Sequence, residues 1–165
     1  MNYVNHRLPA AVWGLVLVLF GCGGNDTEGG EPPGPPEVRL GTPDAETELS
    51  FDPLEPGEPI RYAGSGQSGL FLRMGLRAKH LGADVTALVR VTDTTTGLSV
   101  EESFRFQMVC ETDTGWCTEF PVYLRATSLG TPQELDGRKV TVYARVSTKQ
   151  GWVAEATTPA VLEML

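Results

Sequence analysis

From residue 38 onward, apolar and polar residues alternate in short runs that are separated by Gly, Pro, Asp and Thr. In the clearest run, LFLRMGLRAK at 70–79, every second residue is apolar and the positions between are mostly cationic. A period of two predicts a strand with one buried side and one solvated side. The predicted inward residues are Leu70, Leu72, Met74, Leu76 and Ala78; Val85, Ala87, Val89 and Val91; Phe104, Phe106, Met108 and Cys110; Phe120, Val122 and Leu124; and Val140, Val142, Ala144 and Val146.

Weaker strand patterns occupy 37–40, 47–52 and 59–64, and a last apolar run covers 151–164. No segment has a helical period over three turns, so we expect little helix. Six to nine short strands in the 128 residues from 38 to 165 predict an all-β fold. The expected architecture is an antiparallel β-sandwich, immunoglobulin-like or a related Greek key, with a small closed barrel as the alternative.

The N-terminus carries an apolar run of 12 residues, PAAVWGLVLVLF at 9–20, behind the cation Arg7. A helix that spans a bilayer needs about 20 apolar residues, so this run is too short. A short apolar run behind a positive segment is typical of an export signal. We therefore predict a signal peptide at 1–21.

The stretch LFGC at 19–22 resembles the lipobox of bacterial lipoproteins. The resemblance implies cleavage before Cys22, acylation of this cysteine, including with palmitate, and attachment to a membrane. More than one acyl chain makes such an anchor lasting. Gly23 and Gly24 lack the Asp that retains many lipoproteins at the inner membrane, which favours the outer membrane, with the domain facing the periplasm or the cell surface.

The segment 23–36, GGNDTEGGEPPGPP, has no aliphatic or aromatic side chain. Such a composition cannot form a core and predicts a disordered tether. The expected organisation is a signal peptide at 1–21, an acylated Cys22 with a linker at 22–37, and a β-domain at 38–165. With Cys22 lipidated, Cys110 and Cys117 are left to form a disulfide in an oxidising compartment.

Charge and composition exclude some partners and favour no enzyme class. The chain has 13 Lys and Arg against 21 Asp and Glu, a net charge of −8, and this excludes nucleic acid as a partner. His80 is the one histidine outside the signal peptide, and we interpret it as a solvated strand end. We expect no cofactor and no catalytic set; the weak candidates for calcium ligands are Asp93, Glu111 and Asp113.

Two similar stretches, TDTGWC and TKQGWV, place Trp116 and Trp152 after polar turns. Together they could form an aromatic platform for a sugar or a peptide. The alternative is that each indole caps the core.

The region from VRLGT to LFLRMGLRA resembles a segment of a group of myxobacterial lipoproteins. The shared positions are Phe51, Pro53, Leu54, Gly57, Gly66, Gln67 and Gly69. The resemblance implies a lipid-anchored envelope protein. We thus expect a non-enzymatic binding or structural role with an envelope protein or glycan as partner; the alternative is an anchored hydrolase, which needs a pocket with at least two carboxylates or His80.

Overall fold

The computed structural model describes residues 34–43, 50–65 and 69–165. The predicted signal peptide, Cys22, most of the predicted linker, the first part of the predicted strand 47–52, and residues 66–68 lie outside the described residues. The secondary structure elements are β1 (Glu37–Pro43), β2 (Phe51–Pro53), β3 (Pro59–Ser65), β4 (Gly69–Lys79), β5 (Asp84–Asp93), β6 (Ser99–Gln107), β7 (Val109–Cys110), β8 (Trp116–Arg125), the 3-10 turn η1 (Thr127–Leu129), α1 (Pro132–Leu135), β9 (Lys139–Ser147) and β10 (Val153–Met164). The all-β prediction is confirmed. None of the helices in these ranges is long and apolar enough to cross a membrane.

All ten strands belong to one curled, mixed sheet. β8 pairs along one edge of β4, while β1 and β3 share its other edge, beside 75–79 and 69–72 respectively. From β3 the sheet continues through β10, β9 and β5 to β6. The pair of β3 and β10 is parallel, whereas the other strand pairs are antiparallel. The two-sheet sandwich is therefore not confirmed.

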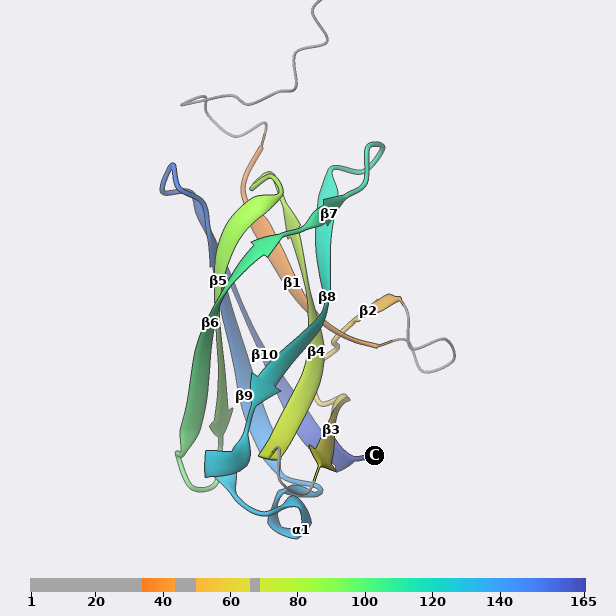
Figure 1. Cartoon of the computed structure of the whole chain (residues 1–165), viewed down its shortest axis with the longest axis vertical. Coiled ribbons are helices and arrows are strands. Elements are labelled where there is room, and N and C mark those ends of the chain that lie inside the picture. The colour runs from red at the N-terminus through yellow and green to blue at the C-terminus, as the bar shows by residue number, and fades with distance from the viewer. Residues whose placement is uncertain (1–33, 44–49, 66–68) are drawn as a thin grey trace, which may run out of the picture. The chain divides into compact units, whose positions relative to one another are not determined.

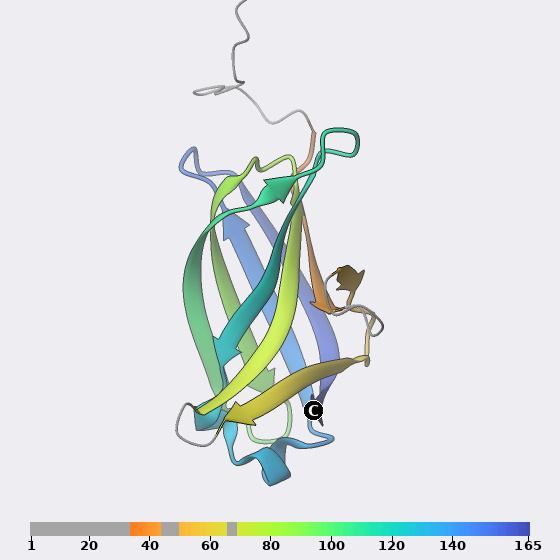
Figure 2. The same ribbon diagram turned by 45° about the vertical axis from the view of Figure 1, so that its right-hand side comes forward.

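The curl brings β6 near β8, so that β4 and β8 form one wall of the domain and β9 and β10 the opposite wall (Figures 1 and 2). At one end of the domain, β7 continues from β6 and pairs with the start of β8. At the other end lies α1 (Figure 1). Further along, β6 and β8 face each other across a seam.

The interior of the curled sheet is filled by the inward residues of the long strands. The predicted sets of β4, β5 and β9 are buried, which confirms them. Leu135 of α1 is fully buried at one end of this core, and the Tyr62 hydroxyl donates a hydrogen bond to the carbonyl of Pro132 at 2.6 Å. Burial of Tyr62, helped by the charge of Asp136, raises its pKa.

The predicted inward orientation is wrong for two residues, Phe120 and Cys110. Phe120 and Pro121 together oppose Gly75, because Leu76 pairs with Glu119 and Met74 with Val122. This β-bulge adds one residue to β8 and moves Phe120 to the outer side of the sheet. Cys110 is exposed, because the chain leaves β6 after Gln107 and pairs with β8 instead, which interrupts the alternation.

Candidate binding surface

The outer side of β1, β4 and β8, with the ring of β2, carries cations and aromatic rings in register. Lys79 lies opposite Trp116, Arg73 opposite Tyr123, and Phe71 opposite Arg125. Arg39 of β1 lies opposite Arg77 on the other edge of β4. We name this surface the cation–aromatic face; it consists of Arg39, Phe51, Phe71, Arg73, Arg77, Lys79, Trp116, Phe120, Tyr123 and Arg125.

At one end of this face three cations surround the half-buried indole of Trp116. The charged groups of Arg39, Arg77 and Lys79 lie 4.7, 5.4 and 5.7 Å from the ring centroid. Each such contact stabilises by about 0.5–1 kcal/mol at an exposed site. Glu37 pairs with Arg39, and Glu111 pairs with Arg77. The indole therefore orients cations whose charge is partly balanced.

Two rings fill a depression in the middle of the face. Gly41 and Gly75 lie opposite each other on β1 and β4. The Phe51 ring packs over both glycines, and the Phe120 ring packs over Gly75; a Cβ atom at Gly75 would lie 2.9 Å from each ring. Glycine is required here because the rings occupy the space of a side chain. The same rings lie under Arg77 and Arg73, with centroid distances of 6.0 and 5.5 Å.

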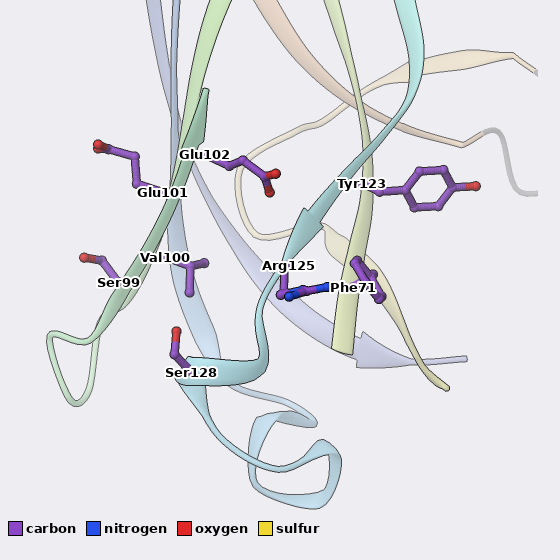
Figure 3. A pocket seen from close by; sticks show the side chains of 8 residues that line it. All are labelled: Phe71, Ser99, Val100, Glu101, Glu102, Tyr123, Arg125 and Ser128. Atoms are coloured by element: carbon purple, nitrogen blue, oxygen red, sulfur yellow. The ribbon is translucent and has the colours of Figure 1, made fainter. Parts of the chain in front are cut away.

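At the other end the face leads into a pocket at the seam between β6 and β8 (Figure 3). The pocket has a volume of about 490 Å³ and is lined by Phe71, Ser99, Val100, Glu101, Glu102, Tyr123, Arg125 and Ser128. Arg125 stacks over Phe71 at 5.6 Å. Glu102 points toward β8, whereas Glu101 points away from the pocket and pairs with Arg90.

Two carboxylate residues, Glu101 and Glu102, line this pocket, but only Glu102 points toward β8 (Figure 3). Glu101 and Glu102 are neighbours on one strand, and alternation sends their side chains to opposite sides. His80 does not line the pocket; its Nδ1 lies 2.9 Å from the carbonyl oxygen of Pro35. Glu102, Arg125 and Ser128 thus place a carboxylate, a guanidinium and a hydroxyl along this seam.

The two predicted platform tryptophans have different surroundings. Trp116 belongs to the cation–aromatic face, whereas Trp152 is partly buried and packs against the hydrophobic core. The core-capping interpretation therefore describes Trp152. Trp116 remains a candidate binding residue, and cations rather than a second indole lie around it.

The weak calcium candidates lie at opposite ends of the domain. Asp93 is the last residue of β5, while Glu111 and Asp113 are in the turn between β7 and β8 (Figure 1). Within the described ranges no three His, Cys, Asp or Glu side chains are grouped as metal ligands. Glu111 already binds Arg77 and accepts the Thr114 hydroxyl.

Asp93 is instead a structural carboxylate with no exposed surface. It accepts the backbone N–H groups of Thr95 and Thr96 and binds the Arg138 guanidinium. Burial alone would raise the pKa of Asp93, but the hydrogen bonds from Thr95, Arg138 and Thr96 outweigh it and lower the pKa to about 2. Glu119, on β8, shows the opposite behaviour, because burial raises its pKa.

The Cys110–Cys117 disulfide is present, as predicted, and joins directly paired residues of β7 and β8. It closes the turn that carries Glu111 and ends at Trp116. The disulfide therefore supports one end of the cation–aromatic face.

Sequence reasoning recognised the cationic side of 70–79 but not the aromatic side chains opposite it. The signal was present in Trp116, Tyr123 and Arg125, which alternate with buried residues in 116–125. Their pairing with β4 depends on the bulge at Phe120, so alternation alone could not give the register. Comparison of the sequence with models of protein families gives no match, and comparison with curated proteins gives none either.

Proposed function

We propose that this chain is a lipid-anchored protein of the cell envelope, held at the outer membrane through Cys22, with a non-enzymatic binding role. The binding site is the cation–aromatic face, and its partner is anionic. The signal-like N-terminus, the lipobox-like LFGC and the coreless tether support the anchor. The observation that carries the binding role is the concentration of five cations on one face of a chain with a net charge of −8.

The aromatic rings under these cations favour binding over a purely structural role. A guanidinium that lies on a ring can still donate the N–H groups at its edge to a carboxylate, sulfate or phosphate. Arg125, which lies over Phe71, is the clearest case on this face. The ring also limits the conformations of the long side chain, which reduces the entropy lost on binding. A surface used only for solubility needs no such order.

The anchor is tested with Cys22→Ala in the full chain. We expect loss of palmitate labelling and a shift of the protein from the membrane pellet to the soluble fraction. Phe20→Ala is the matched control, because it changes the same motif to a more usual small residue and retains Cys22; it should remain labelled. Unchanged labelling of Cys22→Ala would refute the anchor.

The binding role is tested by retention of the full chain on a carboxymethyl matrix at neutral pH and low salt. We expect retention despite the net negative charge, and its loss in Arg39→Gln/Lys79→Gln/Arg125→Gln. The matched control is Arg61→Gln/Arg90→Gln/Arg145→Gln, which removes the same charge from other strands and should be retained. Equal behaviour of the two triple variants would show that the face has no special role.

A further inference from the structure

Resting on the proposed function, we infer that the anionic partner is an acidic polysaccharide, with a uronic acid residue in the pocket beside Arg125. The polymer extends from this pocket along β4 to Trp116. Charge complementarity and the mixed polar lining of the pocket favour this occupant over other anions.

The length of the face fits a polymer. The cations follow β4 from the level of Arg125, opposite Phe71, to Lys79, opposite Trp116. The eight steps from Phe71 to Lys79 span roughly 26 Å at about 3.3 Å per residue. A single phosphate or carboxylate could contact one end of this row but not both, so the arrangement favours a ligand with repeated charges.

The strength of each contact points the same way. One exposed ion contact changes affinity by less than about fivefold. Several contacts on one chain combine, because the second and later contacts form within an already bound molecule. The face therefore reaches useful affinity with a multivalent anion.

The pocket distinguishes a sugar acid from a simple anion. Arg125 offers a cation for one carboxylate, while Glu102, which points toward β8, and Ser128 offer hydrogen-bonding groups for hydroxyls (Figure 3). The Glu102 carboxylate can accept hydrogen bonds from sugar hydroxyls, which a sulfate does not offer. The rings of Phe71 and Tyr123 provide apolar surface for the C–H groups of a sugar, and Tyr123 is 52% exposed.

An anionic bilayer fits the same face less well. Glu37 and Glu111 lie among the cations, and most rings lie against the sheet beneath cations rather than projecting outward. Binding to an anionic membrane is therefore the competing outcome of the test.

The experiment measures binding of the full chain to polygalacturonate, with fully methyl-esterified pectin and dextran as uncharged polymers. We expect binding to polygalacturonate alone, weakened more than tenfold in Arg39→Gln/Lys79→Gln/Arg125→Gln and changed less than threefold in Arg61→Gln/Arg90→Gln/Arg145→Gln. Vesicles rich in phosphatidylglycerol, tested with Cys22→Ala so that no acyl chain contributes, should bind more weakly.

Glu102→Gln separates sugar recognition from general charge attraction. If Glu102 accepts hydroxyls in the pocket, the variant binds polygalacturonate severalfold more weakly; if attraction is only electrostatic, removal of a negative charge tightens binding. Ser103→Ala, a change at the neighbouring position outside the pocket, is the control and should leave binding unchanged.

Tighter binding by Glu102→Gln, or stronger binding to the vesicles, overturns the inference. So does retention on the carboxymethyl matrix without binding to polygalacturonate, and in that case the proposed binding role survives. Absence of retention on the matrix refutes the binding role itself.

Discussion

The charged side chains on the outer side of β5, β6, β9 and β10 have different partners from those on the cation–aromatic face. There, together with Arg61 on β3, the arginines lie beside carboxylates: Arg90 pairs with Glu101, Arg105 with Asp84, Arg145 with Glu155 and Arg61 with Glu163. We name these strands' outer side the neutralised face. On the cation–aromatic face five cations lie over rings, although two of them, Arg39 and Arg77, also pair with carboxylates. On the neutralised face Arg90 lies over the Tyr143 ring in addition to its ion pair.

The neutralised face satisfies its charges internally. Asp84 has a lowered pKa because it accepts a hydrogen bond from Lys149 and lies beside Arg105. The Tyr143 hydroxyl donates to Glu155 at 2.9 Å, and this bond raises the pKa of Tyr143. The described residues carry 12 Lys and Arg against 15 Asp and Glu, and a net negative charge of this size does not exclude a cationic site on one face.

The largest expected effect concerns Asp93, the buried carboxylate below the neutralised face. We predict that Asp93→Asn lowers the free energy of unfolding by about 2–3 kcal/mol at pH 7, because Arg138 loses its buried charge partner. Urea unfolding measures the difference. Asp113→Asn, an exposed turn variant, should change it by less than about 0.5 kcal/mol.

The same residue predicts a pH dependence. The folded-state pKa of Asp93 is about 2, below the ordinary value of 3.8, so its stabilisation is complete above pH 3.8 and is lost as the pH falls toward 2. The loss amounts to about 2 kcal/mol. Asp93→Asn should not show this acid-dependent loss of stability. If the free energy of unfolding fell equally with pH in both proteins, Asp93 would not be its source.

The next effect concerns the disulfide that supports the Trp116 end. Replacing Cys110 and Cys117 together by Ala should lower the free energy of unfolding by about 2 kcal/mol, because the short unfolded loop is no longer closed. Trp fluorescence should shift as well, since the turn ends at Trp116. A reducing agent should destabilise the native chain and leave the double variant unchanged; a response of both would implicate another site.

Burial explains which parts of the fold could be predicted. The alternation in β4, β5 and β9 predicted their inward residues because one side of each strand must face the core. The prediction for Phe120 was wrong because a β-bulge shifts the alternation. Pro121 was a signal for it, since proline within a strand often marks a bulge. The parallel pair of β3 and β10 could not be predicted, since pairing of distant segments leaves no local pattern.

The candidate site was predictable to a smaller extent for a related reason. The cationic side of 70–79 follows from its own sequence. The rings of Phe51 and Trp116 come from other strands, and their positions depend on register and on the glycine pair Gly41 and Gly75. Exposed side chains are not constrained by a core, so the sequence pattern does not predict which of them are neighbours. Their contacts depend on how the strands pair.

A fourth prediction compares one ring from each face. Phe51→Ala should lower the free energy of unfolding by about 1–2 kcal/mol, because its ring covers Gly41 and Gly75 and leaves a depression when removed. Tyr143→Ala on the neutralised face should cost about 1 kcal/mol less, since no paired glycines lie beneath it. Urea unfolding of both variants measures this, and a larger loss for Tyr143 would reverse the comparison.

The smallest effect on stability should separate the two faces most clearly. Arg125→Gln and Arg90→Gln each remove one exposed arginine, and each should change the free energy of unfolding by less than about 1 kcal/mol. Retention on the carboxymethyl matrix should fall with Arg125→Gln, because its guanidinium lies over Phe71 with no carboxylate partner in the part of the chain that the structure describes. Arg90→Gln should leave retention unchanged, because Glu101 already balances that charge. If both variants lost retention equally, average charge rather than the arrangement of cations over rings would govern binding, and the distinction between the faces would have no functional meaning.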